Sequence, residues 1–262
     1  MAYKVSVVSL GCPKNQVDAE KMLASLLSAG FELSVVEAEA DAIIINTCGF
    51  IESAKAEAIE NILECAAYKT DGNLKALIVT GCLAERYKDD ITEEIPEVDL
   101  VVGIGSNSKI AELTLAAIEG NAKNSFGPKE DLDLNGDRLL GGYPFSAYIK
   151  ISDGCDNCCT YCAIPKIRGQ LRSRKIEDIV KESANNFKAV LVTGARQTGK
   201  STLLNLLVGE KVAAIANKVQ TTRTAIKGIV NRENSQIIFV DTPGIHKPVN
   251  KLGKTLNKQA YY

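Results

Sequence analysis

The chain has 262 residues, of which 45% are hydrophobic and 24% are charged, and its formal net charge at pH 7 is −1. This length predicts about two domains, and the hydrophobic fraction is typical of a globular protein. The charge balance argues against a nucleic-acid surface along the whole chain, which would be basic. No apolar run reaches the roughly 18 residues of a membrane helix, and the first residues lack the layout of a signal peptide. We therefore expect a soluble cytoplasmic protein.

The first 120 residues or so alternate short apolar runs with helical patterns. The runs are rich in Val and Ile and do not alternate with polar residues, which is typical of strands buried on both faces of a parallel sheet. Strands are expected at residues 3–10, 31–37, 41–47, 74–80 and 98–104, and helices at residues 15–29, 52–68, 83–90 and 107–119. Together they predict a doubly wound α/β domain over residues 1–122.

Three further segments follow this domain, over residues 123–142, 143–186 and 187–262. Residues 123–142 are rich in Asn, Lys, Asp and Gly, which predicts a surface linker or hairpin. The next segment, residues 143–186, is expected to hold a strand at 146–152, a cysteine-rich loop and a helix at 172–184. A second, partial α/β unit over residues 187–262 is expected to contain strands at 187–194, 224–231 and 235–241 and a helix at 200–208.

Three cysteines stand directly after predicted strands: Cys12, Cys48 and Cys82. Ligand sites of open parallel sheets form outside the carboxyl ends of the strands, so thiols at these positions can meet at one edge. Three such thiolates suit an iron–sulfur cluster with one iron left for another ligand, and three separately buried cysteines explain the pattern equally well. Cys65 lies in an apolar row of a predicted helix, which indicates core packing.

A tighter cysteine pattern occupies residues 155–162, CDNCCTYC. Cys155, Cys159 and Cys162 are spaced so that one short loop holds three thiols. A disulfide would leave one thiol over, and a structural zinc site normally has four ligands. An iron–sulfur site is therefore favoured, and Cys158, which adjoins Cys159, is interpreted as a bystander.

Four strings together resemble the methylthiotransferases, and in particular their RimO branch: GCPKNQVDAEKM, NTCGFIESAKAEAI, TGCLAERY and ISDGCDNCCTYCAIPKIRGQLRSR. The resemblance covers residues 1 to about 184. It implies an auxiliary 4Fe-4S cluster on the three strand-end cysteines, and a second 4Fe-4S cluster on the three loop cysteines. The second cluster would bind and cleave S-adenosylmethionine. The resemblance also implies a substrate aspartate on a small-subunit ribosomal protein, and hence that protein or the ribosome as a partner.

That family continues into a complete radical-SAM barrel and a small β-barrel. In this chain a different sequence follows the first barrel strand, the cluster loop and one helix. We therefore expect a fragment of a radical-SAM barrel over residues 143–186. Such a protein would bind clusters and be a poor enzyme or none.

The string GARQTGKS at residues 194–201 matches the phosphate-loop pattern G-x-x-x-x-G-K-[ST] between a predicted strand and helix. In such loops backbone N–H groups and the Lys bind phosphates, and the Ser hydroxyl binds Mg²⁺. A downstream VDTPG string would add an aspartate for Mg²⁺ and a glycine for the γ-phosphate. Thr222 has two open readings, as a switch residue on the metal or as an ordinary polar loop residue. The candidate nucleotide-binding residues are Gly194, Gly199, Lys200, Ser201, Thr202, Thr222, Asp241 and Gly244.

Residues from about 200 to 262 resemble the Era GTPases, which assist small-subunit ribosome assembly. The resemblance implies GTP and Mg²⁺ as ligands, but no NKxD motif is present to read guanine. The only histidine, His246, is interpreted as a solvated loop residue. Three functions stay open: a methylthiotransferase-like iron–sulfur protein, an Era-like GTP-binding protein involved in ribosome assembly, and a non-catalytic chimera.

Overall fold

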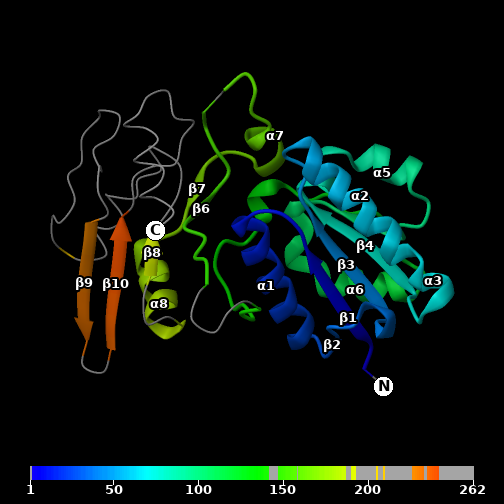
Figure 1. Ribbon diagram of the computed structural model, residues 1–262, viewed down its shortest axis with the longest axis horizontal. Coiled ribbons are helices and arrows are strands. Elements are labelled where there is room, and N and C mark those ends of the chain that lie inside the picture. Colours follow the sequence, from blue (N-terminus) through cyan, green and yellow to red (C-terminus); the bar gives the residue numbers. More distant parts are fainter. Residues whose placement is uncertain are drawn as a thin grey trace. The chain divides into compact units, whose positions relative to one another are not determined.

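The computed structural model describes residues 2–141, 147–157, 159–186, 190–192, 205, 209, 226–232 and 235–241. It divides the chain into two compact units, drawn in Figure 1. Unit 1 comprises Met1–Tyr143 and Tyr148–Ser173, and unit 2 comprises Pro144–Ala147 and Arg174–Tyr262. None of the helices in the described residues has the length and hydropathy that a membrane crossing needs.

Unit 1 is built on a five-stranded sheet with the order β2-β1-β3-β4-β5. Every neighbouring pair of strands is parallel. All six positions of β3 and of β4 are buried, as expected for central strands that are covered on both faces. The strands are β1 (Lys4–Ser9), β2 (Glu32–Leu33), β3 (Ala42–Thr47), β4 (Ala76–Gly81) and β5 (Leu100–Val102). The predicted doubly wound domain is thus confirmed.

Helices cover both faces of this sheet, as Figure 1 shows. Met22 and Ile110 belong to the core on one face, and Ile62 and Leu83 to the core on the other. Cys65 packs in the second core, as predicted. The first face carries α1 (Pro13–Ser28) and α6 (Ile110–Ile118), and the second carries α2 (Glu52–Ala66), α4 (Cys82–Arg86) and α5 (Lys88–Glu94). Shorter elements are η1 (Glu37–Glu39), α3 (Tyr68–Asp71), η2 (Ile104–Lys109) and η3 (Lys129–Asp131).

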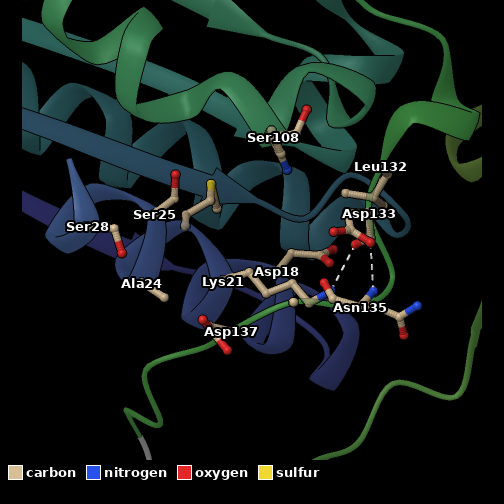
Figure 2. Close-up of a pocket in the computed structure, with 13 residues that line it drawn as sticks. Asp18, Lys21, Ala24, Ser25, Ser28, Ser108, Leu132, Asp133, Asn135 and Asp137 are labelled. Carbon is tan, nitrogen blue, oxygen red and sulfur yellow. Dashed lines mark hydrogen bonds between the residues drawn. The ribbon is translucent and has the colours of Figure 1, made fainter. Parts of the chain in front are cut away.

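The segment predicted as a linker, residues 123–142, packs within unit 1. Leu132 and Leu134 are buried, and Leu132 packs in an apolar cluster with Cys82 and Ile104. Lys21 on α1 donates hydrogen bonds to the carbonyl oxygens of Asp133 and Asn135, at 2.9 and 2.6 Å (Figure 2). Described residues of this segment thus group with unit 1, and the domain boundaries at residues 122 and 142 stay a prediction.

A cavity of about 240 Å³ lies between α1 and this segment (Figure 2). Its lining residues come from α1, from η2 and from residues 132–137. Asp18 and Lys21 on α1 contribute charged groups, and both are bonded to other parts of unit 1. The cavity thus adjoins the contacts that fasten residues 132–137 to α1.

The strand expected at residues 146–152 is almost absent. Only β6 (Ser152–Asp153) forms, pairing antiparallel with β7 (Arg172–Ser173), and residues 147–151 carry no strand. Lys150 is held there by buried ion pairs rather than by a strand partner. The cysteine loop follows β6, and the short helix α7 (Ile164–Arg168) separates the loop from β7.

Unit 2 contains α8 (Ile176–Asn186) and a three-stranded sheet of β8 (Val190–Val192), β9 (Ile226–Arg232) and β10 (Ser235–Asp241). The strand order is β8-β10-β9, with β8 parallel and β9 antiparallel to β10. Val192 and Asp241 are paired at the carboxyl ends of their strands. The other predicted nucleotide-binding residues and His246 lie outside the described residues.

Candidate metal centres

Cys12, Cys48 and Cys82 leave the same edge of the sheet of unit 1. Cys12 follows β1 and caps α1, Cys48 follows β3, and Cys82 follows β4 and opens α4. The strands β1, β3 and β4 are immediate neighbours and run parallel. The topology therefore brings the three predicted ligands to three adjacent strand ends, as open parallel sheets do for their ligand sites.

The loops that carry these cysteines touch one another through glycines. Gly11 has a φ of +97°, and a Cβ added there would lie 2.5 Å from the Cβ of Cys48. A Cβ added to Gly49 would lie 2.8 Å from the Cα of Leu83 and 3.1 Å from the carbonyl carbon of Cys82. A side chain at either position would push the loops apart. The absence of a side chain at both glycines lets the cysteine loops pack at this edge.

Asn15, on the first turn of α1, ties the strand ends together. Its side chain is fully buried, and Nδ2 donates to the carbonyl oxygens of Leu10 and Thr47, at 3.0 and 2.8 Å. The thiol of Cys82 lies 3.7 Å from Asn15 Oδ1. Asn46 Nδ2 in turn donates to the carbonyl oxygen of Asn15 at 2.7 Å. One buried amide thus links the residues that follow or end β1, β3 and β4.

The three thiols differ in exposure, and the pKa of the Cys82 thiol is shifted by its surroundings. Cys48 and Cys82 are buried, and Cys12 is exposed. Burial raises the pKa of the Cys82 thiol, and Cys12 and Cys48 act in the same direction, whereas Arg168 opposes them. A metal cation or another positive charge at this edge would therefore favour the thiolate form of Cys82.

The chemistry of these donors fits an iron–sulfur cluster. Within the part of the chain that the structure describes, no three His, Cys, Asp or Glu side chains are grouped to hold a single metal ion. A four-iron cluster is broader than one ion and takes one thiolate on each of the irons that the protein ligates. Three thiols on adjacent strand ends supply that donor set, and the assignment of Cys12, Cys48 and Cys82 as ligands stays a prediction.

Cys155, Cys159 and Cys162 lie on the loop between β6 and α7. The N–H of Cys155 donates to the carbonyl of Gly169 at 3.1 Å, and the N–H of Asn157 donates to the Cys155 sulfur at 3.4 Å. The N–H of Cys162 donates to the carbonyl of Cys159 at 3.1 Å. Cys159 is exposed and the other two thiols are half-buried, so the loop is anchored at its ends and presents a thiol outward. Cys158 lies outside the described residues.

A buried network of charges fastens this loop region to α1. Asp18 and Asp153 pair with Lys150 and Arg168, and all four side chains are at most 2% exposed. Lys14 adds a contact to Asp153 Oδ1 at 3.1 Å. Burial alone would raise the pKa of Asp153, but Arg168, Lys150 and Lys14 together hold that pKa well below its ordinary value. The Asp153 carboxylate is therefore held in its ionised form within this buried network.

The same helix that follows the loop cysteines packs against a strand-end cysteine. Cys82 forms a small apolar cluster with Ile104, Leu132 and Ile167, and Ala163 packs against it. Ala163 caps α7 and Ile167 lies within it. The two cysteine groups therefore belong to one unit and share α7 as a common support. Sequence reasoning missed this arrangement, together with Asn15, Asp18, Lys150, Asp153 and Arg168.

Comparisons with family models match both parts of the chain. Residues 4–103 match the uncharacterized protein family UPF0004, and residues 189–261 match the 50S ribosome-binding GTPase family. Among solved structures, Era in complex with MgGDPNP and nucleotides 1506–1542 of 16S ribosomal RNA is 45% identical. That match covers 28% of this chain and 25% of the Era chain, with a TM-score of 0.26.

Curated relatives include several proteins named ribosomal protein uS12 methylthiotransferase RimO. The protein of Desulforamulus reducens is 52% identical over 182 residues, which cover 68% of this chain and 40% of the relative. The protein of Acetivibrio thermocellus is 52% identical over 191 residues, covering 70% of this chain and 42% of the relative. The protein of Trichlorobacter lovleyi is 37% identical over 268 residues, covering 99% of this chain and 57% of the relative.

The chain thus spans about half the length of the curated relatives that it matches. Both resemblances expected from the sequence are confirmed. The chain is RimO-like in the part that carries both cysteine groups, and it continues into a GTPase-like segment.

Proposed function

We propose that the chain is a methylthiotransferase-like iron–sulfur protein. In this proposal Cys12, Cys48 and Cys82 hold an auxiliary 4Fe-4S cluster, and the loop cysteines Cys155, Cys159 and Cys162 hold a second one. The observation that carries the proposal is the adjacency of three strand-end thiols in a region 52% identical to RimO over 182 residues. The second cluster, when loaded with S-adenosylmethionine, would supply the radical chemistry of a methylthiotransferase.

The chain's own residues would act by holding the thiols. Gly11 and Asn15 keep the strand-end loops in contact, and the ion pairs of Asp153 fix the start of the cysteine loop. Because the relatives are named for ribosomal protein uS12, we propose a small-subunit ribosomal protein as the substrate, with an aspartate as the acceptor. A cytoplasmic location belongs to the proposal, since thiols there stay reduced.

Slow turnover is part of the same proposal. Residues 189–261 match a GTPase family, and this sequence stands where a methylthiotransferase would continue its barrel. Radical chemistry needs reacting groups held in a closed, well-ordered geometry. We therefore propose that cluster binding is retained and that cleavage of S-adenosylmethionine is slow or absent.

Anaerobic reconstitution with iron and sulfide tests the proposal. The full chain should bind about eight irons, four for each cluster. Cys48→Ser and Cys159→Ser should each lose about half of that iron, whereas Cys65→Ser, a substitution in the apolar core, should lose none. Iron content unaffected by Cys48→Ser would exclude the auxiliary cluster. Many equivalents of 5′-deoxyadenosine per chain would exclude slow turnover.

Nucleotide binding is a second candidate function, favoured by the GTPase family match and by one feature of unit 2. Asp241 ends β10 and is paired with Val192, the last residue of the parallel strand β8, shortly before the phosphate-loop sequence. Asp241 therefore lies at the sheet edge from which the chain enters the phosphate-loop sequence. We propose that a nucleoside triphosphate and Mg²⁺ bind to Gly194, Gly199, Lys200, Ser201, Thr202, Thr222, Asp241 and Gly244.

Calorimetry of the full chain with GTP and ATP tests this candidate. Binding should require Mg²⁺, be largely lost in Lys200→Ala, and be similar for the two nucleotides, because no guanine-reading motif is present. Cys48→Ser is a matched control that should bind nucleotide like the original chain. A strong preference for GTP would contradict the expected lack of base selectivity.

A further inference from the structure

Arg168 lies directly against a predicted ligand of the auxiliary cluster. Its Nη2 is 3.5 Å from the sulfur of Cys82 and 2.6 Å from Asn15 Oδ1. Its Nη1 is 2.9 Å from both Asp18 Oδ2 and Asp153 Oδ2. The guanidinium is thus fixed in the interior by three partners, and it presents an N–H to the thiol sulfur.

The position of Arg168 in the chain links it to the other cysteine group. Arg168 is the last residue of α7, which begins after Ala163 and therefore follows Cys162 closely. Ile167 of the same helix packs in the apolar cluster around Cys82. A helix belonging to the loop cysteines thus supplies both an apolar contact and a positively charged donor to a strand-end cysteine.

We propose that Arg168 is a positioning residue that hydrogen-bonds to the Cys82 ligand of the auxiliary cluster and raises the reduction potential of that cluster. The inference rests on the proposed function, since it requires a cluster on Cys12, Cys48 and Cys82. Hydrogen bonds to ligating sulfurs and nearby positive charge stabilise the more electron-rich, reduced cluster. Burial strengthens this effect, because the local dielectric constant is lower than that of water.

The carboxylates of Asp18 and Asp153 do not cancel the proposed effect of Arg168 on the reduction potential of the cluster. Asp18 and Asp153 bind Nη1, whereas Nη2 is the group turned to the sulfur and to Asn15. The N–H group closest to the Cys82 sulfur therefore belongs to the charged guanidinium. The two carboxylates contact the other terminal nitrogen of the same guanidinium. A variant that removes Arg168 together with the charge of Asp18 keeps the net charge of the buried network while it removes the donor to the Cys82 sulfur.

The test is an EPR-monitored redox titration of the auxiliary cluster in the full chain. Cys155, Cys159 and Cys162 are replaced by Ala so that one cluster remains. Arg168→Gln should shift the midpoint potential to more negative values, Arg168→Lys should restore part of the shift, and the double variant Asp18→Asn/Arg168→Gln should remain shifted. Arg138→Gln is the matched control, because Arg138 is also buried and pairs with a carboxylate, that of Glu20.

Each outcome decides between the two proposals. If the background protein assembles no cluster, the proposed function and this inference both fail. If the cluster assembles and the potential of Arg168→Gln equals that of the background protein, only the inference fails. An equal shift in Arg138→Gln would also overturn it, because any buried arginine would then have the same effect. If Arg168→Gln does not fold, the double variant and Arg168→Lys carry the same comparison.

Discussion

The carboxylate of Asp18 and the ammonium of Lys150 lie 2.5 Å apart although 132 positions separate them in the sequence. Both side chains are almost fully buried. Burying two charges is costly unless they are paired and hydrogen-bonded, so this contact is maintained only when residues 148–173 are folded onto α1. The pair therefore makes the cysteine loop region part of the amino-terminal unit.

We expect Asp18→Asn to destabilise unit 1 strongly. The substitution removes one carboxylate from a network with two buried cations, Lys150 and Arg168, and leaves them with Asp153. Breaking a buried pair from one side costs about 3–5 kcal/mol. Urea unfolding followed by circular dichroism measures this loss.

A surface ion pair provides the control for that measurement. Glu39 pairs with Lys4 at 3.3 Å, with side chains that are 61% and 39% exposed. Glu39→Gln should change the free energy of unfolding by less than about 1 kcal/mol. Equal effects of the two substitutions would mean that the buried network contributes no more than an exposed pair.

We expect Asn15→Ala to lower the iron content of the reconstituted chain without changing any thiol. The carbonyl oxygens of Leu10 and Thr47 would lose their donor, and an unsatisfied buried group costs about 1–3 kcal/mol. The strand-end loops would then be held less firmly. Asn61→Ala is the control, since Asn61 bonds only locally to Glu57 on an exposed face of α2. Full iron retention in Asn15→Ala would show that the clamp is dispensable for cluster binding.

The sheet and the placement of the strand-end cysteines could be predicted because their signals are local. Each of Cys12, Cys48 and Cys82 follows an apolar run that is recognisable as a buried strand. Parallel order then brings neighbouring strand ends together without any long-range information. The apolar row around Cys65 is equally local, because it repeats at helical spacing.

The polar residues of the site could not be predicted in this way. Asn15 and Asp18 lie on α1, where polar side chains normally indicate a solvated face. They are buried because Lys150 and Arg168 reach them from a segment more than 130 positions later. The same tertiary contact explains the missing strand at residues 147–151, where a buried ion pair replaces strand pairing. The polar stretch after residue 122 likewise packs within unit 1, where Leu132 and Leu134 are buried.

We expect Gly11→Ala to destabilise unit 1 more than Gly30→Ala. Both glycines have positive φ, +97° and +89°, so both substitutions introduce backbone strain. Only at Gly11 would the new Cβ meet another atom, the Cβ of Cys48 at 2.5 Å, whereas nothing lies within 4 Å at Gly30. Gly30→Ala should cost about 1 kcal/mol, and Gly11→Ala clearly more, with a lower iron content. Equal costs in urea unfolding would show that Gly11 and Cys48 can separate freely.

Cys65 should make the stability of unit 1 fall with rising pH above about pH 9. Burial raises the pKa of its thiol from 9.0 to about 11, with smaller contributions from Glu37 and Glu64. Between about pH 9 and pH 11 the Cys65 thiol of the unfolded chain releases a proton that the native chain retains. The unfolded state then binds fewer protons, and the free energy of unfolding decreases with pH until the native thiol ionises near pH 11.

A comparison with Cys65→Ala isolates this effect from the tyrosines and lysines that titrate in the same range. At pH 7 the variant should be less stable, because it leaves a small cavity beside Ile62 in the core. Between about pH 9 and 11 the difference should shrink by up to about 2 kcal/mol, since only the original chain carries the retained proton. The measurement is urea unfolding at a series of pH values. A difference that stays constant up to pH 11 would mean that the Cys65 thiol ionises alike in the folded and unfolded chain.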